Sequence, residues 1–147
     1  MTNIIEKLIL KFHRLRFKLI FGRNSNKCNI YGQFVIKHTD KFNFKSGLTI
    51  NDYVYINATN GVYIGENVSL SAGAKIITVK LDYSNNSFFD HVGGPITIGN
   101  NVQIGAGAII LPGVNITNNV IIGAGCVVSK DINHAGVYVG IPAVKIK

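Results

Sequence analysis

Residues 96–132 read ITIGNNVQIGAGAIILPGVNITNNVIIGAGCVVSKDI. An aliphatic residue recurs at every sixth position of this stretch without a break, at Ile98, Ile104, Ile110, Ile116, Ile122 and Val128. The fourth residue after each is apolar or small, and Gly and Asn are frequent between them. Neither helical nor strand periodicity explains this spacing. It predicts short strands joined by tight corners, with the branched side chains inward and Gly or Asn taking left-handed backbone angles. Three such sides would make one triangular coil.

The same spacing continues upstream in pieces, with two-residue breaks between registers. The pieces are Ile64, Leu70 and Ile76, then Ile50 and Ile56, and more weakly Ile30, Ile36, Phe42 and Leu48. Stacked coils pair their strands about 4.8 Å apart and bury the aliphatic column, so ligands must bind outside the prism. A larger interruption at residues 79–94 is predicted to project as a loop, and function is expected there.

Residues 1–23 are predicted to form a basic, amphipathic helix. Asn3 and Glu6 have the spacing of a capping box, and Gly22 can end the helix. The predicted apolar face consists of Ile5, Leu8, Phe12, Leu15 and Leu19. A basic stripe beside it consists of Lys7, Lys11, Arg14 and Lys18. Two alternatives follow: the helix packs on the prism and its neighbours, or it binds an anionic membrane surface where a lipid-linked sugar would be found.

Composition and charge fit a single domain of 147 residues, 47% of them hydrophobic. Residues 1–45 hold ten Lys and Arg against two acids, which accounts for the whole net charge of +8. The remainder is balanced, which argues against nucleic-acid binding. We expect the β-rich part to cover residues 24–147, with a C-terminal tail at 134–147. Cys28 and Cys126 are too far apart to suggest a disulfide framework or a metal site, and no secretory signal or membrane span is evident, so a cytoplasmic protein is expected.

The repeat region resembles the hexapeptide-repeat acyltransferases, particularly the small sugar O-acetyltransferases of surface-polysaccharide and galactoside or maltose type. The resemblance is carried by residues 95–102, 104–108, 111–114, 122–125, 128–131 and 140–143. It implies an all-β fold, a left-handed parallel β-helix. Physical reasoning alone favours right-handed crossovers between parallel strands, so the hand comes from the resemblance.

A catalytic base is expected at His91. Moving an acetyl group from a thioester to a hydroxyl requires removal of the hydroxyl proton, and neutral imidazole suits that step near pH 7. His13 lies in the basic N-terminal segment, His38 in the weakest repeat and His134 after the last coil. His91 lies in the predicted loop, and members of the family often carry their base just before the Pro-Ile coil. The alternative is an ordinary exposed loop histidine.

The sequence departs from the galactoside and maltose branch at two places. Where that branch has its histidine, this chain reads TVKLDY at residues 78–83, with no imidazole. Either His91 has taken over the role or catalysis is lost. Gln103 stands where that branch tends to have Trp, which leaves the acceptor open. Asp82 and Asp90 are candidates to orient the imidazole, although exposed aspartates in polar loops more often form turns.

The resemblance also implies a cofactor groove and an assembly. The pantetheine arm of acetyl-CoA would lie along an external groove, and Ser129 and Lys130 match family positions near its nucleotide end. The cofactor-binding residues expected on this basis are Gly105, Ala106, Ala124, Ser129, Lys130 and Lys145. The small residues among them are also needed at corners of the repeat. A homotrimer is implied, with the base from one subunit and much of the groove from the next.

We therefore expect an acetyl-CoA-dependent O-acetyltransferase that acts on a sugar or sugar-lipid hydroxyl in surface-polysaccharide (O-antigen or capsule) biosynthesis. Two alternatives remain open: an N-acyltransferase of an amino sugar nucleotide, and a catalytically silent structural β-helix. A zinc site of the carbonic-anhydrase type would need three converging histidines, and the four here are widely separated in the sequence, so no metal is expected.

Overall fold

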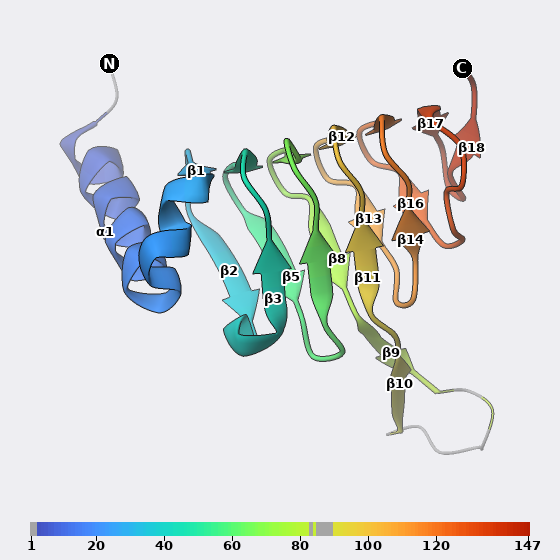
Figure 1. Cartoon of the computed structure of the whole chain (residues 1–147), viewed down its shortest axis with the longest axis horizontal. Helices are drawn as coiled ribbons and strands as arrows, with labels where there is room; N and C mark the ends of the chain where they lie inside the picture. Colours follow the sequence, from blue (N-terminus) through green and yellow to red (C-terminus); the bar gives the residue numbers. More distant parts are fainter. Residues whose placement is uncertain (1–2, 83, 85–89) are drawn as a thin grey trace.

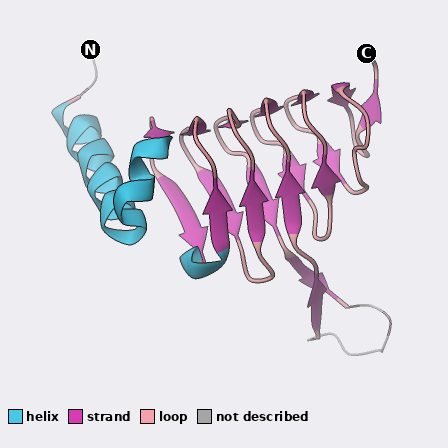
Figure 2. Ribbon diagram, in the orientation of Figure 1, coloured by secondary structure: helices cyan, strands magenta, loops and turns pink. Residues whose placement is uncertain are grey.

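The computed structural model describes residues 3–82, 84 and 90–147. A stack of strand-built coils extends from a helix at the N-terminal end to the C-terminus at the opposite end (Figure 1). One two-stranded projection leaves the stack, formed by β9 (Val79–Leu81) and β10 (His91–Gly93). Helix is confined to the N-terminal part of the chain (Figure 2). Its elements are α1 (Ile4–Phe21) and two short 3-10 helices, η1 (Gly22–Lys27) and η2 (Thr39–Lys41).

Three sheets form the faces of a prism, and all their pairings except the last, β17 with β18, are parallel. Face A contains β1 (Cys28–Ile30), β4 (Leu48–Ile50), β7 (Ser69–Leu70), β12 (Val102–Ile104), β15 (Val120–Ile122), β17 (Gly136–Val139) and β18 (Val144–Lys145). Face B contains β2 (Phe34–Lys37), β5 (Val54–Asn57), β8 (Lys75–Ile77), β13 (Ile109–Ile110) and β16 (Val127–Val128). Face C contains β3 (Phe42–Phe44), β6 (Val62–Ile64), β11 (Ile96–Ile98) and β14 (Asn115–Ile116).

The inward residues stack in columns that fill the prism. On face B, Ile110 pairs in register with Ile76 on one side and Val128 on the other. All three are buried, which confirms the inward assignment drawn from the six-residue period. The weak upstream register predicted at Ile30, Ile36, Phe42 and Leu48 is corrected at its last two residues. Phe44, and not Phe42, lies in register with Ile64, and Ile50, and not Leu48, lies in register with Ile30.

Every insertion into the six-residue period falls between face B and face C. Ile36 and Phe44 are eight residues apart, as are Ile56 and Ile64, whereas Ile110 and Ile116 are six apart. The projection, which leaves after β8 and returns into β11, occupies the same edge. We call this edge the insertion corner (residues 57–61, 78–82, 90–95 and 111–114). The edge between faces A and B is the small-residue corner (residues 105–107 and 123–125).

Asparagines hold the third corner, between faces C and A. Asn67, Asn101 and Asn119 have φ values of 54°, 55° and 58°. Asn67 Nδ2 donates to Asn101 Oδ1 at 3.3 Å, and Asn101 Nδ2 donates to Asn119 Oδ1 at 3.1 Å. The predicted use of Asn at left-handed corners is therefore confirmed, since its short amide side chain tolerates this conformation and forms a ladder between coils.

Helix α1 begins and ends as the sequence indicates, but it packs through another face. The Asn3 side chain accepts from the first turn while Glu6 accepts from the backbone N–H of Asn3, so the capping box is complete. Phe17 is buried against the rings of Phe34 and Phe44 at 5.7 and 5.6 Å. The face predicted from helical spacing is instead exposed. Among the described residues, no helix has the length and apolarity needed to cross a bilayer.

Candidate active site

The projection is an antiparallel hairpin that places His91 opposite Leu81. The pairing continues with Val92 opposite Lys80, and the N–H of Asp82 donates to the carbonyl of Asp90 at 2.8 Å. Paired residues of an antiparallel ribbon have their side chains on the same face. His91 is exposed and shares a ribbon face with Leu81, its partner in the stretch 78–83. Tyr83 and residues 85–89, which belong to the predicted loop, lie outside the described residues.

A buried threonine fixes the hairpin to the prism. Thr78 is fully buried, and its hydroxyl donates to the carbonyl of Asn57 at 2.8 Å and accepts from the N–H of Asn60 at 3.1 Å. The Asn60 amide donates to the carbonyl of Thr78 at 2.7 Å. A Cβ on Gly93 would overlap that carbonyl, so only glycine lets the returning strand approach this closely. Sequence reasoning missed this clamp, because nothing in the local pattern links residues 57–60 to residue 78.

The two predicted orienting aspartates lie near His91 on the hairpin. The carboxylate of Asp82 accepts from the hydroxyl of Ser84 at 2.7 Å and from its N–H at 2.9 Å. These bonds, first the hydroxyl and then the backbone N–H, hold the pKa of Asp82 below its ordinary value. Asp90 is exposed. Within the described part of the chain, neither carboxylate is hydrogen-bonded to His91, so the orienting role stays a prediction.

A polar hollow of about 390 Å³ lies on the insertion corner, on the α1 side of the hairpin. Asn60, which is hydrogen-bonded to Thr78 at the root of the hairpin, also lines this hollow. Two other lining residues are joined by a hydrogen bond, in which Lys41 Nζ donates to the carbonyl of Thr59 at 2.9 Å. The lining residues are Asp40, Lys41, Asn43, Thr59, Asn60, Gly61 and Tyr63. Hydroxyl, amide, carboxylate and ammonium groups with one aromatic ring suit a polyhydroxylated ligand.

The predicted groove residues Gly105, Ala106 and Ala124 lie together on the small-residue corner. Ala106 and Ala124 are exposed on adjacent coils, and the N–H of Gly125 donates to the carbonyl of Ala106 at 2.8 Å. A Cβ on Gly105 would press on the backbone of the next coil, so this glycine is required by the stack itself. The result is a smooth ledge of methyl groups and backbone, against which an extended arm can lie.

The remaining predicted cofactor residues lie elsewhere in the same chain. Ser129 and Lys130 are exposed where β16 ends, at the far end of the edge that carries the hairpin. Lys145 lies in β18, where it pairs with Tyr138 of face A. Face B separates the hairpin from the ledge, a width of about 15 Å for roughly five extended residues. One chain therefore does not bring His91 and Ala106 together.

Gln103, which stands where the related branch tends to have Trp, is half-buried on face A. Its amide donates to the hydroxyl of Ser71 at 2.7 Å on the neighbouring coil. The side chain is thereby held along the sheet.

The other three histidines lie outside the hairpin, although His38 lies on the same B–C edge, between β2 and β3. His13 packs against Phe34 with ring centroids 5.4 Å apart, and burial, followed by the charge of Arg16, lowers its pKa below the ordinary value of 6.5. His38 precedes η2 in a left-handed conformation, and His134 follows the last coil. Within residues 3–82, 84 and 90–147, no three His, Cys, Asp or Glu side chains are grouped so that they could hold a metal ion.

Comparison with known proteins finds hexapeptide-repeat transferases. Residues 95–130 match the family described as bacterial transferase hexapeptide (six repeats). The galactoside O-acetyltransferase of Escherichia coli K12 is 39% identical over 100 residues, 68% of this chain and 47% of that protein. The crystal structure of a maltose O-acetyltransferase from Clostridium difficile 630 gives a TM-score of 0.78 at 25% identity, covering 99% of this chain and 88% of that chain. A galactoside acetyltransferase in complex with coenzyme A gives 0.73 at 25% identity, covering 94% and 81%.

These likenesses confirm the left-handed hexapeptide-repeat fold and the resemblance to sugar O-acetyltransferases. The chain spans about half the length of the curated relatives it matches, 54% and 47% for two of them.

Proposed function

We propose that this chain, a left-handed hexapeptide-repeat protein that resembles the sugar O-acetyltransferases, transfers the acetyl group of acetyl-CoA to a sugar hydroxyl. The observation that carries the proposal is the position of His91 on a hairpin clamped to the insertion corner. The pairing with Leu81 supports the idea that His91 replaces the histidine missing from residues 78–83.

His91 acts as the general base in this proposal. Its neutral imidazole takes the proton of the sugar hydroxyl while the oxygen attacks the thioester carbonyl. The tetrahedral intermediate collapses, the carbon–sulfur bond breaks, and the imidazolium returns the proton to the leaving coenzyme A sulfur. The transfer is direct. Cys126 points into the core, and burial raises the pKa of the Cys28 thiol to about 12, so neither is suited to carry the acetyl group.

The N–H of Ala106 is a candidate donor to the oxyanion. In the described chain, the N–H groups of Gly105 and Gly107 donate to the carbonyls of Ile122 and Ala72 at 2.8 and 2.9 Å. The N–H of Ala106, between them, has no protein acceptor there. A free backbone N–H on a rigid corner suits charge that develops only in the transition state. The methyl ledge formed with Ala124 would guide the pantetheine arm, with Ser129, Lys130 and Lys145 as candidates for its phosphates.

The active unit is a homotrimer in this proposal. His91 and Ala106 lie on different edges of one prism, so a base and an oxyanion donor can share a substrate only if they come from different chains. Three copies around an axis parallel to the prism would place each insertion corner beside a neighbouring small-residue corner.

The acceptor is proposed to be a saccharide in surface-polysaccharide biosynthesis, bound in the polar hollow beside Asn60. The reaction would take place in the cytoplasm, at the membrane surface where lipid-linked saccharides are assembled. Acylation of an amino sugar nucleotide is the enzymatic alternative, and a catalytically silent β-helix is the other.

The test is to incubate the wild-type protein, His91→Ala and the control His134→Ala with labelled acetyl-CoA and a panel of sugars. We expect His91→Ala to lower turnover at least roughly a hundredfold with cofactor affinity and assembly unchanged, and His134→Ala to behave as wild type. Label on an amine but not on a hydroxyl would favour the amino-sugar alternative. Absence of cofactor binding would favour the silent β-helix, and full turnover in His91→Ala would remove His91 from the mechanism.

A further inference from the structure

Helix α1 carries a broad apolar face that the prism does not cover. At 3.6 residues per turn, Leu10, Phe17 and Phe21 lie on one side, and this is the side that packs on the prism. The opposite side is occupied by large apolar residues with more than half of their surface exposed. We call them the α1 stripe: Ile4, Ile5, Leu8, Phe12, Leu15 and Leu19, with exposures of 74%, 60%, 61%, 63%, 56% and 77%.

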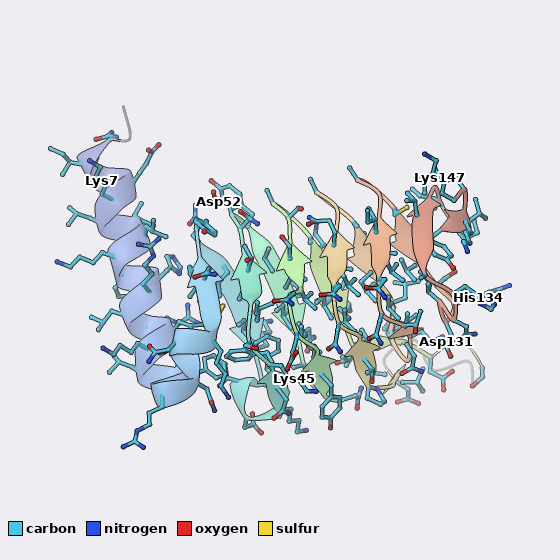
Figure 3. The ribbon with its side chains drawn as sticks, turned by 45° about the horizontal axis from the view of Figure 1, so that its top comes forward. Lys7, Lys45, Asp52, Asp131, His134 and Lys147 are labelled. Carbon is cyan, nitrogen blue, oxygen red and sulfur yellow. The ribbon has the colours of Figure 1, made fainter. Side chains whose placement is uncertain are left out.

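Basic side chains border the α1 stripe along one side. They are Lys7, Lys11 and Lys18, and all three are exposed. Lys7 lies near the free end of α1 (Figure 3). Arg16 adds a further cation on the other side of the stripe, and its guanidinium lies 6.0 Å from the Phe34 ring. The helix holds five Lys and Arg against one acid, Glu6. Wide apolar faces rarely stay exposed on soluble proteins.

The positive charge of α1 distinguishes between two possible partners of the α1 stripe, a second copy of the chain and a membrane. A second copy docked through the same face would bring two strongly basic helices together, which costs free energy through like-charge repulsion. A bilayer that contains anionic lipid instead accepts the apolar side chains below its headgroups and attracts the lysines at its surface. Residues 46–147 are electrically balanced, and residues 1–45, which include α1, carry the whole net charge, so the attraction is concentrated on this end of the molecule.

We propose that the α1 stripe is a membrane-docking surface that inserts into the headgroup region of anionic bilayers, with α1 lying in the plane of the membrane. Because α1 packs on β2 at the end of the stack, docking would leave the coils standing away from the lipid (Figure 1).

If α1 lies on the membrane, the position of the hairpin sets the distance between the bilayer and the acceptor hydroxyl. This consequence rests on the proposed acetyl transfer. β8 is the third strand of face B counted from the α1 end, two strand spacings beyond β2. Two spacings of about 4.8 Å and a helix about 10 Å thick place the root of the hairpin roughly 20 Å from the outer side of α1. The reacting hydroxyl would therefore belong to a lipid-linked saccharide and stand about 20 Å from the bilayer surface.

Docking is tested on the full chain by co-sedimentation with vesicles of phosphatidylcholine, with and without phosphatidylglycerol, in the absence of acetyl-CoA and acceptor. One variant replaces stripe residues by Gln, namely Leu8, Leu15 and Leu19, and its control is Val35→Gln, a 44% exposed valine on β2. A second variant replaces bordering lysines by Gln, namely Lys7, Lys11 and Lys18. Its charge-matched control replaces Lys37, Lys45 and Lys75 by Gln. Light scattering reports the oligomeric state of each variant.

We expect the wild-type protein to bind only the anionic vesicles and to be released by about 0.5 M salt. The lysine variant should bind roughly a hundredfold more weakly, since each of the three lysines near the surface should contribute about fivefold to the affinity for the membrane. The stripe variant should lose binding, and both controls should bind as wild type. Equal binding by the stripe variant, or failure of the wild type to bind anionic vesicles, would overturn the proposal. A smaller oligomer in the stripe variant would identify the stripe as an interface between copies, which also overturns it. Acetylation of a soluble sugar should survive the stripe changes, so failure of docking and failure of the proposed activity are separately visible.

Discussion

Replacement of Ile110 by alanine tests whether the prism has a filled core. A filled core leaves no room for a ligand inside, so the binding site must lie on the outside. Ile110 is fully buried, between Ile76 and Val128 in the face B column. Alanine removes three carbons, which forfeits about 2.4 kcal/mol of transfer free energy at about 0.8 kcal/mol each. The neighbouring coils are fixed by backbone ladders and cannot close the space, so the cavity adds about 1–2 kcal/mol. We expect Ile110→Ala to lower the free energy of unfolding by about 4 kcal/mol.

Ile121→Ala is the matched control, because Ile121 is the same residue type in strand β15 but is 48% exposed. Its cost should stay below about 1 kcal/mol. The measurement is urea unfolding of both variants at one fixed protomer concentration, since oligomers unfold in a concentration-dependent way. The difference should appear in the midpoint with the slope unchanged. Equal losses in the two variants, or a loss below about 1 kcal/mol for Ile110→Ala, would refute the column.

Three further outcomes follow from single side chains. The lowered pKa of His13 means that the unfolded chain binds its proton more readily than the folded chain does. The stability that His13 contributes should be complete above about pH 6.5 and fall as the pH drops through the folded-state pKa. Thermal melts from pH 7.5 to 5.5 should show this loss, and His13→Gln should reduce the dependence of stability on pH. With the pKa of Cys28 raised to about 12 by burial and Cys126 enclosed in the core, iodoacetamide at pH 8 should label neither thiol of the native protein, whereas both should react in urea. Gly93→Ala should displace the hairpin and lower turnover with little change in cofactor affinity; normal turnover would show that the clamp does not position His91.

The sequence by itself determined the repeat. The inward residues recur at a fixed short spacing, each strand meets the coil next to it, and asparagine or glycine marks the corners, so the local pattern and the native pairing agree from Ile98 to Val128. The capping of α1 was readable for the same reason, because Asn3 and Glu6 act within one helical turn. The hairpin was readable as an interruption of the period, whereas the catalytic role of His91, the histidine within it, stays a prediction.

Only the tertiary structure decided which face of α1 packs and which site residues share an edge. The helix is apolar around most of its circumference, so its own sequence cannot rank the faces; the aromatic rings of Phe34 and Phe44 at the end of the prism select Phe17 and leave Phe12 exposed. The clamp that fixes the hairpin joins Asn60 to Thr78 across stacked coils, and the ledge at Ala106 lies one prism face away from His91. Which residues of different coils come together depends on how far the coils are offset and rotated along the stack. Contacts between residues distant in the sequence produce no local sequence pattern, so they could not be predicted from the sequence.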